Sequence, residues 1–210
     1  MGLFEKIKLY MQLLLKGDWW TINYRLQLLF RQIDLKNVYL DKLNLTAEKS
    51  HYYADSGGAA LEKVLDSFHI TPQDAIIDFG SGKGGALITL AKYPFARITG
   101  VEISPELIAI ARRNLKKLWI DNVDMALCDA AEFTELEDYN YVYFFSPFPS
   151  SVMQIVIKNL KGSLAKKPRK MTIIYLNPEC HEAVVTDSPF VKQQEFEHPT
   201  LRYYIYSNKV

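Results

Sequence analysis

A string of glycines follows a short apolar run in the segment AIIDFGSGKGG, residues 75–85. Gly80, Gly82 and Gly84 fit the spacing G-x-G-x-G, while Gly80, Gly82 and Gly85 fit G-x-G-x-x-G, the spacing of dinucleotide-binding loops. Glycine has no Cβ, so such a loop can turn sharply and let a ligand lie against its backbone. The pattern therefore indicates a nucleotide-like cofactor, but the glycines alone do not choose among the cofactors that bind in this way.

The acid that stands before the loop narrows the choice. Asp78 lies two residues before Gly80, at the end of the apolar run. A carboxylate there would repel the pyrophosphate of a dinucleotide, whereas it would attract the ammonium and sulfonium of S-adenosylmethionine. Asp78 and the loop residues Gly80, Ser81, Gly82 and Gly84 therefore favour S-adenosylmethionine. The alternative is that Asp78 caps a helix or braces the loop.

Two more acids end apolar runs farther along the chain. Glu102, about 20 residues beyond the glycines, is placed to accept hydrogen bonds from ribose hydroxyls, with Ile103 beside it. Asp129 is placed to accept from the exocyclic amine of adenine, with the backbone of Ala130 near the ring. Both acids support a nucleoside, and a solvated strand-end acid is the alternative for Asp129.

The elements that must position these residues follow from the hydrophobic pattern. From residue 75 onward, short apolar runs alternate with segments of helical period, after a helix predicted at 58–68. Repeated strand–helix units indicate a doubly wound parallel sheet. The strands are predicted at 75–79, 97–102, 123–128, 139–146 and 171–177, and the helices at 84–92, 105–118, 150–164 and 179–185.

The segments FVKQQEFE and LRYYIYS lie on either side of His198-Pro199-Thr200 and predict a hairpin. So short a connection cannot cross between parallel strands, so one strand runs antiparallel. The predicted fold class is α/β, a doubly wound and mostly parallel seven-stranded sheet with a C-terminal antiparallel hairpin, plus N-terminal helices. We expect an N-terminal helical segment over 1–56, with helices at 3–16 and 22–33, and the α/β domain over 57–210.

The composition argues against a nucleic-acid partner, a disulfide framework and a metal site. The 210 residues carry a formal net charge of +1 and show no extended basic stripe, so nucleic acid is not the expected partner. The two cysteines, Cys128 and Cys180, are too few for a disulfide framework and favour a cytoplasmic location. The four histidines show no metal-binding spacing, and we expect no metal.

Taken in order, the segments IIDFGSGKGG, GVEISPELIAIARRNL, CDA and YVYFFSPFP resemble the successive motifs of class I S-adenosylmethionine-dependent methyltransferases. The resemblance covers about residues 57–207. It implies the seven-stranded fold, S-adenosylmethionine as cofactor and S-adenosyl-L-homocysteine as product. By position, it implies that Asp78, Gly80, Gly82 and Gly84 surround the methionine part, that Glu102 binds the ribose, and that Asp129 and Ala130 lie at the adenine.

The resemblance also implies that the SPFP segment, residues 146–149, faces the methyl group. Relatives that methylate amines carry Asn/Asp-Pro-Pro-Tyr/Phe there, and this chain departs from that pattern. We expect Ser146, Pro147 and Phe148 to form the catalytic rim, where a hydroxyl and carbonyls accept hydrogens from an amine and Phe148 stacks beside it. A Pro-rich turn that opens the next helix is the alternative. The expected acceptor is an amine nitrogen on a protein, with a small molecule as the alternative.

The segment before the α/β domain leaves other interpretations open. Tyr53 is expected to line the cofactor site, because this region often covers the cofactor in the related enzymes. The helix at 3–16 is apolar over a broad face and has lysines nearby, which suits packing on the domain, a homodimer contact or peripheral contact with a membrane. For the whole protein, an NAD-dependent oxidoreductase and a non-catalytic S-adenosylmethionine-binding protein stay as alternatives.

Overall fold

The structure of the protein is a computed structural model that describes residues 26, 28, 30–36, 55–146, 148–198 and 201–209. The predicted helix at 3–16, together with Tyr53 and Pro147, lies outside the described residues. Of the helix predicted at 22–33, the described residues Leu26, Leu28 and Phe30 are helical.

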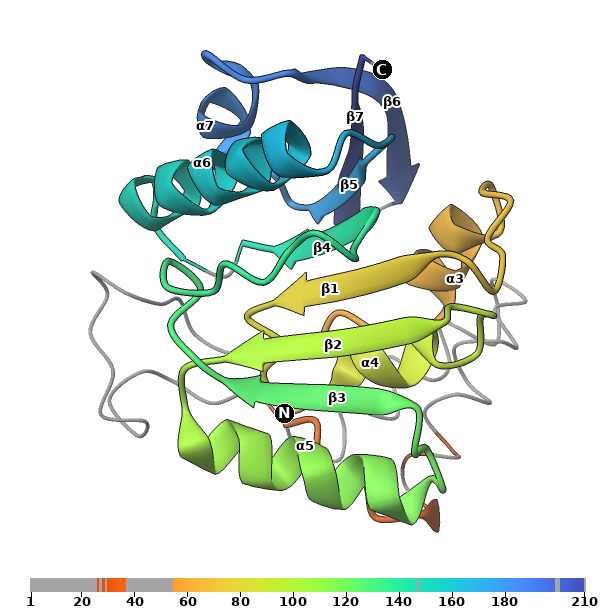
Figure 1. Cartoon of the computed structure of the whole chain (residues 1–210). Coiled ribbons are helices and arrows are strands. Elements are labelled where there is room, and N and C mark those ends of the chain that lie inside the picture. The colour runs from red at the N-terminus through yellow and green to blue at the C-terminus, as the bar shows by residue number, and fades with distance from the viewer. Residues whose placement is uncertain are drawn as a thin grey trace.

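A seven-stranded mixed sheet forms the centre of the molecule, in the order β3-β2-β1-β4-β5-β7-β6 (Figure 1). The first five strands are parallel, and β7 pairs antiparallel with both β5 and β6. The predicted fold class, including the C-terminal hairpin, is confirmed. The strands are β1 (Ala75–Phe79), β2 (Arg97–Glu102), β3 (Val123–Leu127), β4 (Tyr141–Phe145), β5 (Thr172–Leu176), β6 (Phe190–His198) and β7 (Leu201–Asn208).

Helices cover both faces of the sheet, as the apolar strands require. Side chains of α6 and α7 pack with Ile77 and Phe79 on one face, and side chains of α3, α4 and α5 pack with Ile76 and Tyr143 on the other (Figure 1). The helices are α3 (Ala59–Leu65), α4 (Gly85–Leu90), α5 (Pro105–Lys117), α6 (Ser150–Lys166) and α7 (His181–Val185). Within the described residues, no helix has the length and hydropathy needed to cross a bilayer.

Helix α5 begins where the sequence predicts it. Ser104 is its N-cap, with Oγ accepting a hydrogen bond from Leu107 N at 3.3 Å, and Pro105 occupies the first turn, where a missing N–H costs nothing. Because α5 follows β2 directly, this cap fixes the path of the chain just after Glu102.

The described residues before the α/β domain pack against it. Ile33 and Leu35 contact the apolar core on the α3 and α4 face. Asp34 N donates a hydrogen bond to Asn114 Oδ1 on α5 at 3.1 Å. Residues 33–35 therefore form part of the folded unit, although they lie inside the predicted N-terminal segment.

Candidate cofactor and acceptor site

The carboxyl ends of the parallel strands meet at one edge of the sheet, marked in Figure 1 by the arrowheads of β1, β2 and β3. β1 pairs with β2 on one side and with β4 on the other, so the strand order reverses between β1 and β4. Open α/β sheets bind ligands in the crevice beyond the strand ends at such a point. The glycine loop follows β1 here, Glu102 ends β2, and Asp129 and Ser146 follow β3 and β4.

The glycine loop adopts a backbone that favours glycine at three positions. Gly80, Gly82 and Gly84 have φ values of 77°, 54° and 83°, in the left-handed region. At position 85 glycine is needed for lack of space, since a Cβ there would lie 1.9 Å from Asp55 Oδ1. The left-handed positions follow the G-x-G-x-G spacing, and the fourth glycine admits Asp55 beside the loop.

Ser81 folds back over β2 within this loop. A Cβ at Gly100 would lie 2.7 Å from Ser81 Oγ, so β2 leaves room for the serine there. Ser81 is buried, and among the described residues its Oγ has no hydrogen-bond partner. A buried hydroxyl without a partner is costly, and a polar ligand atom in the crevice would relieve that cost.

Asp78 is buried in the sheet beneath the loop. It lies level with Gly100 on β2 and with Tyr143 on β4 and is 2% exposed. Burial raises the pKa of Asp78 well above its ordinary value, and the nearby charge of Glu102 raises it further. A cation bound beside this carboxylate would stabilise its ionised form. Asp78 therefore suits a positively charged ligand group.

Glu102 has a structural role in addition to the one expected from the sequence. Its Oε2 accepts a hydrogen bond from Gly82 N and its Oε1 accepts one from Ser104 N, each at 2.9 Å. Burial raises its pKa, against the lowering effect of the backbone N–H groups of Ser104, Gly82 and Ile103. A carboxylate offers about four acceptor positions, so Glu102 can hold the loop and still accept from ribose hydroxyls.

Replacing Glu102 with alanine is expected to weaken S-adenosylmethionine binding by about 1–3 kcal/mol, because charge-assisted hydrogen bonds are lost and Gly82 is released. The sheet should stay folded, since the residue ends β2. Isothermal titration calorimetry measures the affinity, and circular dichroism checks the fold. An unchanged affinity would remove Glu102 from the site.

Asp129 follows β3 at the same edge, where the sequence places it. Its Oδ1 accepts a hydrogen bond from Ala131 N at 3.0 Å, so the side chain braces its own turn. Ala130 is buried beside it. Asp129 therefore has a local structural contact, and any contact with adenine would be made in addition to it.

Ser146 and Asn177 join the ends of β4 and β5. Both have left-handed backbones, with φ values of 33° and 47°. Ser146 Oγ donates a hydrogen bond to the carbonyl of Asn177. Asn177 also binds β7, since its N donates to Arg202 O at 2.7 Å and its Oδ1 accepts from Arg202 N at 3.1 Å. Strained residues held in this way are frequent at functional sites.

The side chain of Phe148 is buried. It is 3% exposed and packs in the core on the α6 face, edge-on to Phe144 with ring centroids 6.1 Å apart. The ring is therefore a core side chain in this structure. Of the three predicted rim residues, the structure places Ser146 at the crevice.

Sequence reasoning missed three residues at this edge. Lys83 lies inside the glycine loop, Asp55 lies against Gly85, and Asn177 ends β5 beside Ser146. A polar residue at a strand end, such as Asn177, could have been found by the same argument that selected Asp129. The contact of Asp55 with the loop joins segments 30 residues apart along the chain, so no local sequence pattern indicates it.

The described residues at this edge fit a cationic nucleoside such as S-adenosylmethionine. The left-handed glycines provide a backbone cradle, Ser81 Oγ offers an unused polar atom, and Asp78 offers a desolvated carboxylate. Glu102 and Asp129 end the next two strands in order. Within the described part of the chain, no group of three or more His, Cys, Asp or Glu side chains could hold a metal ion.

Known proteins resemble parts of the chain. The ribosomal RNA small subunit methyltransferase A of Malacoplasma penetrans is 31% identical over 101 residues, which cover 48% of this chain and 36% of that protein. Human EEF1A lysine methyltransferase 2 is 36% identical over 62 residues, 29% of this chain and 26% of that protein. The matched regions thus span well under half of these relatives.

A solved structure shares the fold. The RNA methyltransferase from Salinibacter ruber, in complex with S-adenosyl-L-homocysteine, superposes with a TM-score of 0.55 at 19% identity, over 71% of this chain and 90% of that one. The family described as methyltransferase domain matches residues 70–198. This range runs from before β1 to the end of β6 and includes the glycine loop and the strand ends beyond it. The chain therefore belongs to the methyltransferase domain family.

Proposed function

We propose that this protein transfers a methyl group from S-adenosylmethionine to an amine nitrogen, and that the amine belongs to a protein. Family membership and the crevice geometry support the cofactor. Asp78 would face the ammonium and sulfonium end, the glycine loop would lie along the methionine part, Glu102 would accept from the ribose, and Asp129 would lie toward the adenine. An NAD-dependent oxidoreductase is less favoured, because Asp78 would repel a pyrophosphate.

The bound cofactor supplies an activated methyl group, so the protein's own residues need to hold the acceptor in line with it and exclude water. A strong general base is not required for this. In this proposal, the residues that follow β4 and β5 at the crevice would orient the acceptor.

The observation that carries the amine proposal is the hydrogen bond from Ser146 Oγ to the carbonyl of Asn177. A hydroxyl has one hydrogen to donate and two lone pairs that accept. With its hydrogen committed to Asn177 and the hydroxyl of Tyr175 also hydrogen-bonded to it, Ser146 Oγ can meet an acceptor molecule only through its remaining lone pair. Lone pairs bind the N–H hydrogens of an amine and direct the nitrogen lone pair toward the methyl group. The hydroxyl thus serves in place of the Asn or Asp of related amine methyltransferases.

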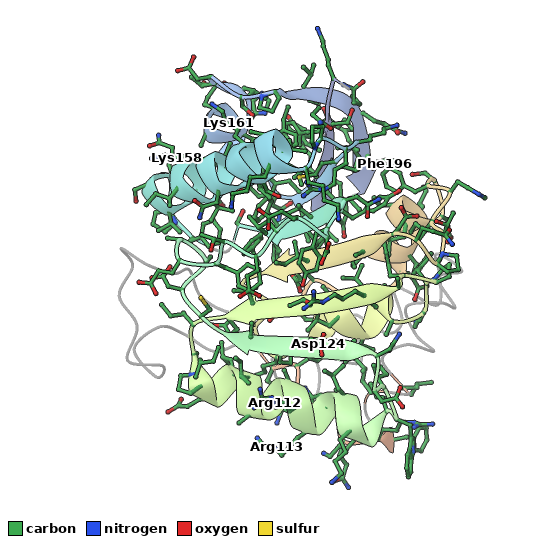
Figure 2. All side chains as sticks on the ribbon, in the orientation of Figure 1. Arg112, Arg113, Asp124, Lys158, Lys161 and Phe196 are labelled. Carbon is green, nitrogen blue, oxygen red and sulfur yellow. The ribbon has the colours of Figure 1, made fainter. Side chains whose placement is uncertain are left out.

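The charges around the crevice favour a protein over nucleic acid. The described acids at or beyond the strand ends include Asp129 and Glu179. The guanidinium of Arg202 there faces two carboxylates, those of Glu195 and Glu197. Figure 2 shows the labelled cations Arg112 and Arg113 on α5 and Lys158 and Lys161 on α6, the helices that flank the sheet. An acidic rim repels phosphate groups, on which affinity for nucleic acid largely depends. It would attract a basic polypeptide.

Replacing Ser146 with alanine is expected to lower the rate of methyl transfer about tenfold, since one acceptor of the amine hydrogens is lost. The cofactor affinity should change less than twofold. Ser146→Asn should retain most of the activity, because Asn tolerates a left-handed backbone and offers a carbonyl oxygen in place of the hydroxyl. The assay supplies labelled S-adenosylmethionine to the protein in cell lysate.

The lysate is then separated into protein, nucleic acid and low-mass fractions. Label in the protein fraction, retained after nuclease treatment and released by protease, supports a protein acceptor. Label confined to the nucleic acid or low-mass fraction would contradict it. Equal rates for wild type and Ser146→Ala would remove Ser146 from the acceptor site.

A further inference from the structure

A lysine lies buried in the centre of the glycine loop. Lys83, between Gly82 and Gly84, is 2% exposed. Its Nζ donates hydrogen bonds to Asp34 Oδ1 at 2.9 Å and to the carbonyl oxygen of Lys36 at 2.8 Å. Burying an ammonium is very costly unless it is paired and hydrogen-bonded. The buried position of Lys83 therefore depends on residues 34–36.

Asn114 on α5 reinforces this junction. Its Nδ2 donates to the carbonyl oxygens of both Asp34 and Lys83 at 3.0 Å, and its Oδ1 accepts from Asp34 N at 3.1 Å. Asn114 is itself 2% exposed. One buried amide thus joins the backbone of the early segment to the backbone of the loop, beside the ion pair.

The same contacts favour the ionised form of the Asp34 carboxyl group. Partial burial alone would raise its pKa, but the hydrogen bond and charge of Lys83, together with the Lys36 N–H, bring the pKa below its ordinary value. Asp34 is therefore ionised at neutral pH and neutralises the lysine.

The rest of the loop is held by β2. Gly80 N and Ser81 N both donate to Val101 O, at 2.9 and 3.0 Å, and Gly82 N donates to Glu102. Lys83 instead binds residues that precede it by 49 and 47 positions. At this point the shape of the loop depends on a segment outside the predicted α/β domain.

We propose that Lys83 and Asp34 are positioning residues for the cofactor, so that residues 34–36 set its affinity by holding the glycine loop without touching the cofactor. The ion pair directs the lysine ammonium toward Asp34 and neutralises it. This matters because the methionine part of S-adenosylmethionine, which the loop would contact, carries an ammonium and a sulfonium. The inference rests on the proposed cofactor and not on the proposed acceptor.

The two partners predict unequal effects. Asp34→Asn leaves a buried ammonium without its carboxylate, and removing one partner of a buried pair is strongly unfavourable. Lys83→Met replaces the lysine with an apolar chain of similar length and leaves Asp34, whose side chain is 46% exposed, to water. We therefore expect about tenfold weaker S-adenosylmethionine binding for Asp34→Asn and about threefold for Lys83→Met. The double variant should bind like Lys83→Met.

The experiment titrates the full chain with S-adenosylmethionine, S-adenosylhomocysteine and methylthioadenosine, which lacks the amino acid end, by calorimetry. All measurements are made well below the melting temperature of each variant. Affinity for the first two ligands should fall together, while affinity for methylthioadenosine should stay within twofold. Glu62→Gln, which breaks the exposed Lys92–Glu62 ion pair of 2.5 Å, serves as the matched control and should leave every affinity unchanged.

An Asp34→Asn protein that melts earlier but binds S-adenosylmethionine like the wild type would overturn the inference, because the pair would then only stabilise the fold. A parallel loss of methylthioadenosine binding would also overturn it, since the effect would not be confined to the loop. If Asp34→Asn does not fold, the affinities of Lys83→Met for the three ligands test the inference by the same criteria. A wild type that binds none of the ligands would contradict the proposed cofactor itself.

Discussion

Asp78→Asn is expected to weaken S-adenosylmethionine binding about 100-fold and to raise the melting temperature of the cofactor-free protein. The loss of affinity, about 2.7 kcal/mol, is that of a charge-assisted interaction with a cationic ligand in a desolvated site. The gain in stability has the same origin. Asp78 is 2% exposed, and burial raises its pKa well above its ordinary value. Asparagine keeps the shape without a buried charge.

The sign of the stability effect follows from proton linkage. A carboxyl group whose pKa is higher in the folded protein than in the unfolded chain binds its proton more tightly when folded. Its favourable contribution is present below the unfolded pKa and is lost as the pH rises through the raised, folded pKa. Once the pH has risen through that raised pKa, the ionised Asp78 opposes folding until a cationic ligand binds beside it.

The same shift makes cofactor binding depend on pH. Affinity should decrease as the pH falls through the raised pKa of Asp78, because the protonated acid no longer attracts the ammonium and sulfonium. In Asp78→Asn this pH dependence should disappear. Calorimetry across the pH range measures the affinity, and thermal melts without cofactor measure the stability.

Asp124→Asn provides the matched control for Asp78→Asn. Asp124 lies on β3 at the edge of the sheet and its side chain is 71% exposed (Figure 2). It should change neither the affinity nor its pH dependence. A variant at Asp78 that binds the cofactor as tightly as the wild type would contradict the assignment of Asp78 to the cationic end of the cofactor.

The sheet was predictable because its strands are nearly continuous apolar runs flanked by helical periods. The exact ends of the strands were harder to predict from the sequence. The fourth and fifth strands were predicted to end at Ser146 and Asn177, but both residues adopt left-handed backbones, and the strands stop one residue earlier. Neither is glycine, so composition does not reveal the turn. Their conformations are held by hydrogen bonds between strand ends, which exist only in the folded sheet.

The strand-end acids were predictable because parallel strands bring their carboxyl ends to one edge. The hydrogen bonds that those acids make within the protein were not predictable from the sequence. Glu102 accepts from Gly82 N, and Asp129 accepts from Ala131 N. The sequence around an aromatic residue such as Phe148 looks the same whether its ring lies at the rim of a site or in the core. The packing of Phe144 against the ring shows that it lies in the core. The pairing of Lys83 with Asp34 spans 49 positions and follows no local pattern.

Gly100 gives the second large expected effect, since its missing side chain makes room for the glycine loop. It lies level with Asp78, in the middle of β2. A Cβ there would lie 2.7 Å from Leu87 Cδ1, 2.7 Å from Ser81 Oγ and 2.9 Å from Ser81 Cβ. Leu87 belongs to α4 and Ser81 to the loop, so one added methyl group would press on both. The close approach thus couples the packing of α4 to the shape of the cofactor cradle.

Gly100→Ala is expected to lower the free energy of unfolding by about 3 kcal/mol, the upper part of the range for overpacking, and the melting temperature by roughly 6–12 °C. It should also weaken S-adenosylmethionine binding, because Ser81 must move. Gly162→Ala in α6 is the matched control, since a Cβ there meets nothing within 4 Å. That change should stabilise the protein by about 0.5–1 kcal/mol through helix propensity. Urea unfolding of both variants measures the difference, and equal stabilities would show that the loop and α4 do not approach β2 at Gly100 this closely.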